Sequence, residues 1–93
     1  MITILFICHG NICRSTMAQY ILQHLVEQNG ISEKFYIDSA ATSYEEIGNG
    51  VHHGTRNKLA KEGIYCGEHK ARRMTKQDYR DYDYIIGMDT ANI

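Results

Sequence analysis

The chain has 93 residues, of which 43% are hydrophobic and 23% charged, and its formal net charge is -1. This length predicts a single domain, residues 1–93, that buries a modest core. The charge balance lacks the basic excess of a nucleic-acid binder, so we expect no nucleic-acid partner. Residues 70–76, KARRMTK, form a local basic cluster that we interpret as solvated surface.

The chain begins with a short apolar run, MITILF. The run is too short to span a membrane and lacks the leader of a signal peptide, so we expect a cytoplasmic protein with no membrane partner. The three cysteines suit no disulfide framework, which indicates a reducing compartment where a thiol is kept for chemistry. Cys66 and His69 have a ligand-like spacing, with His52 and His53 upstream, but no second well-spaced pair completes a tetrahedral site, so we predict no metal.

Residues 2–7, ITILFI, are continuously apolar and β-branched, which predicts a strand covered on both faces. A glycine-containing turn follows. Residues 14–30 then place apolar side chains at helical spacing, with Gly30 as the stop. Residues 34–40 and 82–88 predict two further strands.

A second helix is predicted over residues 55–63, with Thr55 as its N-terminal cap and Gly63 as its stop. Residues 42–54 are expected to form an ordered loop. Strands that alternate with helices imply right-handed crossovers and a parallel α/β sheet. Because the sequence ends at Ile93, directly after the third strand, we expect a truncated sheet whose uncovered edge favours self-association or domain exchange.

The turn between the first strand and the first helix is the candidate site, because ligands of open parallel sheets bind beyond the carboxyl ends of the strands. Cys8 to Arg14 has the form C-x5-R, and such a span can curl into a cradle of backbone N–H groups for an anion. Arg14 can hold two phosphate oxygens at once.

Cys8, beside a helix N-terminus and an arginine, is expected to be a thiolate at neutral pH. It would attack phosphorus and form a phosphocysteine that water hydrolyses, and Ser15 could donate a hydrogen bond to the sulfur as it leaves. Two simpler interpretations stay open at this point. Cys8 can be a small buried hydrophobe, or the turn can bind a nucleotide phosphate without chemistry.

The octet CHGNICRS resembles the signature loop of the low-molecular-weight protein tyrosine phosphatases. The similarity continues through DSAATS (38–43), EIGNG (46–50), HKAR (69–72) and YDYIIGMD (82–89). The resemblance implies a doubly wound α/β fold with a four-stranded parallel sheet, about three strands of which are present here, and helices on both faces. It also implies hydrolysis of phosphotyrosine or small aryl phosphates, with inorganic phosphate as a product and no metal or organic cofactor.

The resemblance further implies roles for residues of the phosphate-binding loop, 8–15. Cys8 would be the nucleophile, and Arg14 would be the phosphate clamp. The phosphate-binding positions would be His9, Gly10, Asn11, Ile12, Cys13 and Arg14. The network that supports the loop and steadies the thiolate would comprise Asn11, Ser15, Ser39 and His69.

Two more residues have roles in the family. Cys13 matches a second loop cysteine that can form a reversible disulfide with Cys8 and protect it from over-oxidation. Tyr44 lies in the variable loop beside the substrate entrance, where an aromatic ring can stack on the phenyl ring of phosphotyrosine. The alternative interpretations are a packed small residue for Cys13 and an ordinary loop tyrosine for Tyr44.

The sequence departs from the family pattern in two places. Thr16 stands where the family commonly has proline, which removes some preorganisation but no chemistry. The family's general acid is an aspartate in a D-P-Y loop beyond residue 93, and these 93 residues contain no proline. Such an acid is worth about 10²–10⁴-fold, so we expect impaired activity, with Asp89 as a hypothetical weak surrogate.

Two rival functions remain open. Arsenate reduction uses the same thiolate but needs a downstream cysteine pair, and only Cys66 follows the loop. A non-catalytic phosphotyrosine-binding module is favoured by the missing acid and disfavoured by the presence of both Cys8 and Arg14. Among other carboxylates, we expect Asp38 and Asp83 to make local contacts only.

Overall fold

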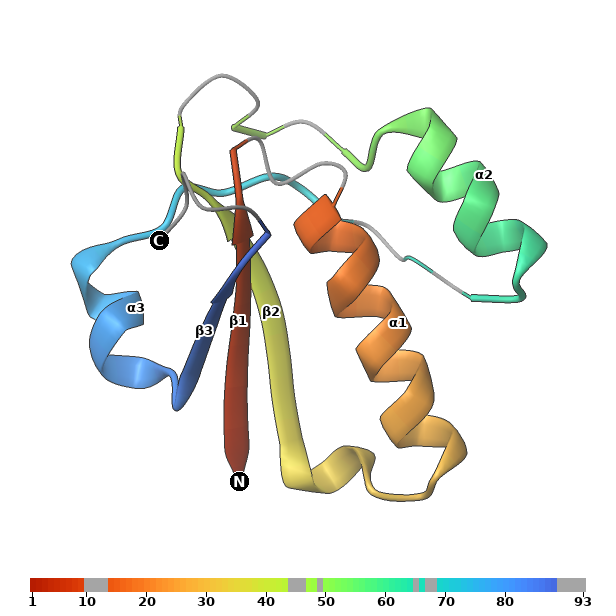
Figure 1. Cartoon of the computed structure of the whole chain (residues 1–93), viewed down its shortest axis with the longest axis horizontal. Coiled ribbons are helices and arrows are strands. Elements are labelled where there is room, and N and C mark those ends of the chain that lie inside the picture. Colours follow the sequence, from red (N-terminus) through yellow and green to blue (C-terminus); the bar gives the residue numbers. More distant parts are fainter. Residues whose placement is uncertain (10–13, 44–46, 49, 65, 67–68, 89–93) are drawn as a thin grey trace.

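A computed structural model describes residues 1–9, 14–43, 47–48, 50–64, 66 and 69–88 of the chain. In chain order its elements are β1 (Ile2–Cys8), α1 (Arg14–Gln28), the 3-10 turn η1 (Ser32–Lys34), β2 (Phe35–Ala41), α2 (His53–Lys61), α3 (Lys76–Asp81) and β3 (Tyr84–Gly87). The strands form a parallel sheet of order β2-β1-β3. Helices α1 and α2 lie on one side of this sheet and α3 on the other (Figure 1). The predicted parallel α/β fold is confirmed. None of the described helices has the length and apolar character needed to cross a membrane.

Strand β1 lies between the other two strands and is buried from Leu5 to Cys8. Its register places Leu5 opposite Asp38 of β2 and Ile85 of β3. A central strand covered on both faces needs continuous apolar residues. The strand predicted over residues 2–7 is therefore confirmed, and it extends by one residue to the candidate nucleophile.

The two faces of the sheet bury different side chains. Phe6 and Ile37 pack with Val26 of α1 on one face. The other face carries Leu5, Ile7 and Ala40, against which Met74, Tyr82 and Ile85 pack. Because side chains alternate along a strand, Cys8 shares the face of Phe6 and is directed toward α1.

Both predicted glycine stops are confirmed as hydrogen-bonded helix ends. After α1, the N–H of Ile31 donates to Val26 O at 2.9 Å and that of Gly30 donates to Glu27 O at 3.1 Å. Gly30 has a φ of 69° and Gly63, after α2, a φ of 73°. This left-handed conformation, together with the paired bonds, is the Schellman ending that glycine favours. The helices therefore end where the sequence predicts.

The start of α2 differs from the prediction. The helix begins at His53, and Nδ1 of His52 accepts the N–H of Gly54 at 3.2 Å. Thr55 lies inside the helix and is buried. The prediction of Thr55 as the cap was wrong, because the His52 ring nitrogen performs the task that a hydroxyl more often has.

Helix α3 was not predicted from the sequence. Its start is a reciprocal cap, in which Asp78 Oδ2 accepts the Thr75 N–H at 2.7 Å and Thr75 Oγ1 accepts the Asp78 N–H at 3.4 Å. The four residues from Thr75 to Asp78 have the capping-box spacing, which is the signal that could have located this helix. A helix of six residues is too short to show apolar periodicity.

Arg72 ties α3 to the sheet, so the basic segment 70–76 is more than solvated surface. Its guanidinium donates to Asp38 of β2 at 3.1 Å and to Asp78 of α3 at 3.0 Å. The expectation of local contacts for Asp38 was therefore wrong. Asp83 is also non-local, since its Oδ2 accepts the Thr3 N–H at 3.0 Å. Burial disfavours the charge on Arg72, but the hydrogen bond with Asp78 and the charges of both carboxylates outweigh burial and raise the pKa of Arg72.

Through the ionisation of Asp78, part of the free energy of unfolding should depend on pH. Burial opposes its ionisation, but hydrogen bonds from Arg72 and the Thr75 backbone outweigh burial and lower the pKa of Asp78. A carboxyl whose pKa is lower in the folded than in the unfolded chain stabilises the fold above about pH 3.9, and this contribution is lost as the pH falls through the folded pKa.

We expect Asp78→Asn to lower the free energy of unfolding by about 1–2 kcal/mol at pH 7 and by less at pH 3. Urea unfolding at the two pH values measures the difference. Asp81→Asn, at an exposed carboxylate of the same helix, is the matched control and should show a smaller change with pH. Equal losses for Asp78→Asn at both pH values would contradict the assignment.

Candidate active site

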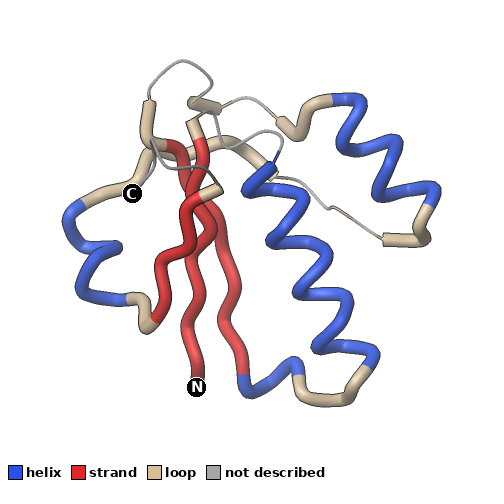
Figure 2. Tube along the Cα trace, in the orientation of Figure 1, coloured by secondary structure: helices blue, strands red, loops and turns tan. Residues whose placement is uncertain are grey.

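The carboxyl end of β1 lies near the start of α1 (Figure 2), and Cys8 is the last residue of β1 while Ser15 is the second residue of α1. Cys8 Sγ lies 2.9 Å from Ser15 Oγ, and this contact is buried. The residues are 5% and 0% exposed. A hydroxyl at this distance can donate to an ionised sulfur and stabilise its negative charge. The structure thus brings together the predicted nucleophile and the predicted donor to it.

The start of α1 supplies a positive environment for this sulfur. Arg14 is the first residue of the helix, and the first turn holds no acidic residue. The first backbone N–H groups of a helix lack acceptors within it, and the helix dipole is positive there. An anion that approaches Cys8 therefore meets the end of a helix suited to bind it.

Backbone and side-chain bonds fix the chain where it leaves β1. The N–H of Thr42 donates to Cys8 O at 2.9 Å, and the N–H of Ser43 donates to His9 O at 3.1 Å. The Ser43 hydroxyl also donates to His9 O, at 2.9 Å. His9, a predicted phosphate-binding residue, is exposed. The carbonyl groups of Cys8 and His9 are thus tied to the residues that follow β2.

Ser39, predicted to support the loop, is completely buried in β2. Its hydroxyl donates to Gln19 Oε1 of α1. Farther along the helix, Gln23 Nε2 donates to Ile37 O at 3.1 Å. The partner that the structure gives Ser39 therefore holds α1 against β2. Sequence reasoning missed Gln19, and the available signal is its position four residues after Ser15 on the same helix face.

His69 lies against the first part of α1. Its Nε2 is 3.4 Å from Thr16 Oγ1, and its ring is edge-on to Tyr20 with ring centroids 6.3 Å apart. Thr16 is 0% exposed. Sequence reasoning treated Thr16 as a loss of preorganisation, whereas the structure shows a polar contact that proline could not make.

Several predicted site residues lie outside the described part of the chain. They are Gly10, Asn11, Ile12, Cys13 and Tyr44, and the hypothetical surrogate Asp89 is also among them. Their roles stay predictions.

Cys66 is buried in an apolar cluster with Val51 and Leu59. Met17, Tyr20 and Ile64 pack against this cluster. Among the described residues, no three His, Cys, Asp or Glu side chains gather as a metal site. Cys66 is therefore part of the packing between α1 and α2.

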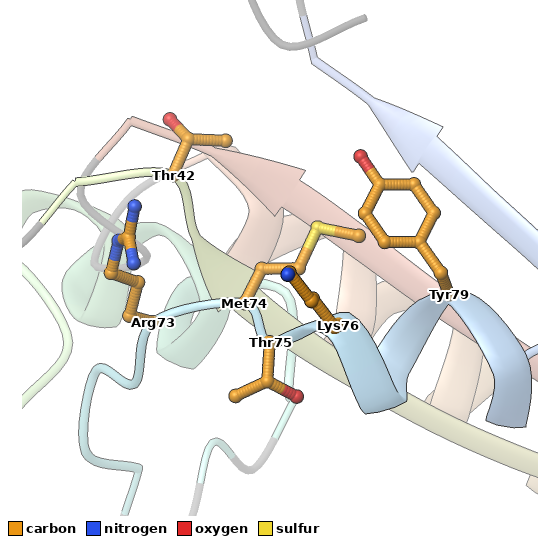
Figure 3. Close-up of a pocket in the computed structure, with 6 residues that line it drawn as sticks. All are labelled: Thr42, Arg73, Met74, Thr75, Lys76 and Tyr79. Atoms are coloured by element: carbon orange, nitrogen blue, oxygen red, sulfur yellow. The ribbon is translucent and has the colours of Figure 1, made fainter.

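An open cavity of about 570 Å³ lies on the α3 side of the sheet. It is lined by Thr42, Arg73, Met74, Thr75, Lys76 and Tyr79 (Figure 3). Thr42 connects it to the end of β1 through the bond to Cys8 O. The Cys8 side chain, however, contacts α1 on the opposite face. Among the described residues, the lining of this cavity includes neither Cys8 nor a residue of α1.

Comparisons with known proteins agree with this arrangement. The profile of the family described as low molecular weight phosphotyrosine protein phosphatase matches residues 3–93. The chain is 46% identical over 93 residues to low molecular weight protein-tyrosine-phosphatase YfkJ of Bacillus subtilis. The aligned region covers 100% of this chain and 60% of that protein. It is 43% identical over 91 residues to the low molecular weight phosphotyrosine protein phosphatase of Mus musculus. That alignment covers 98% of this chain and 57% of the mouse protein.

The crystal structure of YfkJ from Bacillus subtilis superposes with a TM-score of 0.97 over 99% of this chain and 58% of that chain. The chain thus spans about 60% of the length of the curated relatives it matches. Over that span, the sequence match includes the turn after β1, and the fold match includes all three strands of the sheet. The chain belongs to the low molecular weight phosphotyrosine protein phosphatase family.

Proposed function

We propose that this protein hydrolyses phosphate monoesters of tyrosine and other aryl alcohols through a phosphocysteine intermediate. The observation that carries the proposal is the buried 2.9 Å contact of Cys8 Sγ with Ser15 Oγ at the start of α1. A thiol beside a helix N-terminus favours the thiolate form, which is the nucleophile. Arg14, the first residue of α1, adds a planar cation that suits phosphate.

Two displacements account for the reaction. In the first, the Cys8 sulfur forms a bond to phosphorus while the bond from phosphorus to the aryl oxygen breaks, and the aryl oxide takes up a proton. In the second, water attacks phosphorus, the sulfur leaves as thiolate, and inorganic phosphate is released. Ser15 donates a hydrogen bond to the sulfur as its charge returns, while Arg14 and the helix N-terminus balance the charge on the phosphate oxygens.

The setting of this activity is part of the proposal. Residues 1–93 form the N-terminal portion of one phosphatase domain, and its substrates are phosphotyrosine-containing proteins or small aryl phosphates. The protein acts in the cytoplasm, since its three cysteines suit a reducing compartment. Within the described residues, β3 pairs with β1 alone, and Tyr84 and Ile86 are 59% and 42% exposed. An unpaired edge of this kind favours self-association or domain exchange.

Rapid mixing of the 93-residue chain with p-nitrophenyl phosphate tests the proposal. We expect a burst of p-nitrophenol close to one equivalent per Cys8, followed by slower turnover as the phosphocysteine hydrolyses. With phosphotyrosine we expect a smaller burst, because a phenol whose pKa is about 10 is a poor leaving group without a proton donor.

The absence of a burst with both substrates, together with binding of inorganic phosphate, would favour the non-catalytic binding module. Formation of arsenite from arsenate in the presence of a thiol would favour arsenate reduction. Within these 93 residues, Cys66 is 6% exposed in an apolar cluster and is poorly placed to pass a disulfide outward.

A further inference from the structure

Side-chain hydrogen bonds between α1 and other described segments differ in their place along the helix. Gln19 and Gln23 bond to β2 beyond the first turn. Ser15 contacts Cys8, and Thr16 contacts His69, both within the first turn. These two contacts of the first turn are made by adjacent residues.

These first-turn contacts belong to a closed ring around the carboxyl edge of the sheet. The ring passes in order through Cys8, Ala41, Arg72, His69, Thr16 and Ser15 and returns to Cys8. Cys8 pairs in register with Ala41. The Ala41 N–H donates to Arg72 O at 2.6 Å, and the Met74 N–H donates to Ala41 O at 2.7 Å. The segment that carries His69 is thus itself bonded to the strand beside the nucleophile.

We propose that Thr16 is a positioning residue for the Cys8 thiolate. Its hydrogen bond with His69 closes the ring and fixes the first turn of α1, and with it the Ser15 hydroxyl, at the sulfur. This inference rests on the proposed function for its effect on turnover, but not for its effect on the thiol itself. Thr16 is 0% exposed, and a buried hydroxyl is a costly group that native folds keep paired.

The partner of Thr16 is held in a fixed orientation. His69 packs edge-on against Tyr20, a residue one turn after Thr16 on α1. The contact serves the same purpose whichever of its two atoms donates, because either direction fixes the distance between α1 and the segment of His69.

Two interactions that stabilise the Cys8 thiolate depend on the distance between α1 and the segment of His69. The effect of a helix N-terminus is confined to its first turn, and the hydrogen bond from Ser15 Oγ weakens steeply as it lengthens or bends. Displacement of a reacting group by about 1 Å can cost about 10²-fold in rate. A first turn that is released from His69 is therefore expected to stabilise the thiolate less and to leave Cys8 less reactive near neutral pH.

Thr16→Val tests the proposal, because it removes the hydroxyl and keeps the branched shape. The readout is the rate of Cys8 alkylation by iodoacetamide as a function of pH, with the modified residue identified by mass spectrometry. We expect the alkylation curve to move to higher pH and the burst rate with p-nitrophenyl phosphate to fall about tenfold, with little change in KM. Thr16→Ser, which keeps a hydroxyl, should retain the curve of the unmodified chain.

Thr55→Val is the matched control. Thr55 is also a buried threonine, 3% exposed, but it lies in α2 away from Cys8. We expect its substitution to leave the alkylation curve unchanged. Urea unfolding of both variants gives their loss of stability. If Thr16→Val loses stability without moving the curve, or if Thr55→Val moves it equally, Thr16 has only a structural role and the proposal is overturned.

A double variant tests whether Thr16 acts through His69. If the two form one unit, Thr16→Val combined with His69→Ala moves the alkylation curve no farther than His69→Ala alone. Shifts that add would overturn the proposal. Alkylation needs no phosphatase activity, so a curve that moves in Thr16→Val while the unmodified chain shows no burst would support this inference and contradict the proposed function.

Discussion

Cys8→Ser is expected to lower kcat for p-nitrophenyl phosphate by about 10⁴-fold or more while phosphate binding is retained. Serine is close to cysteine in size and can keep the contact with Ser15, 2.9 Å in the present structure. Its hydroxyl, however, stays protonated at neutral pH, whereas the thiolate is the species that attacks phosphorus. Steady-state kinetics and calorimetric titration with inorganic phosphate measure the two properties separately.

Cys66→Ser is the control for this prediction. Cys66 lies among Val51 and Leu59, so a hydroxyl there is buried in apolar surroundings and should lower the free energy of unfolding. The value of kcat should stay that of the unmodified chain, because Cys66 belongs to the apolar cluster with Val51 and Leu59 between α1 and α2. Loss of turnover in Cys66→Ser with turnover kept in Cys8→Ser would refute the assignment of the nucleophile.

Leu5→Ala is expected to lower the free energy of unfolding by about 3 kcal/mol. Leu5 lies in the central strand, is 0% exposed and packs with Ile7 of the same strand and Ala40 of β2. Its truncation leaves a cavity that neighbours on both sides of β1 cannot readily fill. Since small domains are stable by about 5–15 kcal/mol in total, the loss should be plain as a lower midpoint of urea unfolding.

Leu25→Ala removes the same atoms from α1, where Leu25 is 47% exposed. We expect this control to cost less than about 1 kcal/mol. If the two variants lost equal stability, the central position of β1 would not be the reason for the effect.

The parts of the fold that follow from local patterns were predictable. The apolar run of residues 2–7 predicted β1, and glycines predicted the ends of α1 and α2. The C-x5-R turn between a strand and a helix also predicts a phosphate site from its place in an open parallel sheet, and that site stays a prediction. In each of these cases the determining residues are neighbours in the chain.

The parts that depend on distant segments were not predictable from patterns. Arg72 reaches Asp38 of β2, and His69 reaches Thr16 of α1, because the parallel register brings their segments to one edge. Nothing close to Thr16 in the sequence indicates a buried hydrogen bond. The resemblance to a family pointed to Ser39 and His69 as supporting residues. It did not point to their hydrogen-bond partners in the structure, which are Gln19 for Ser39 and Thr16 for His69.

The central place of β1 has a consequence for synthesis in the cell. Strand β1, which carries Cys8, is translated before β2 and β3, but Thr3 finds its partner Asp83 at a separation of 80 residues. At ribosomal rates of about 5–20 residues per second, this interval lasts roughly 4 to 16 s. During that time the nascent chain presents an apolar strand with an unpaired edge, a segment of the kind that chaperones bind. Completion of the sheet around β1 therefore awaits translation through β3, long after Cys8 and Ser15 have been made.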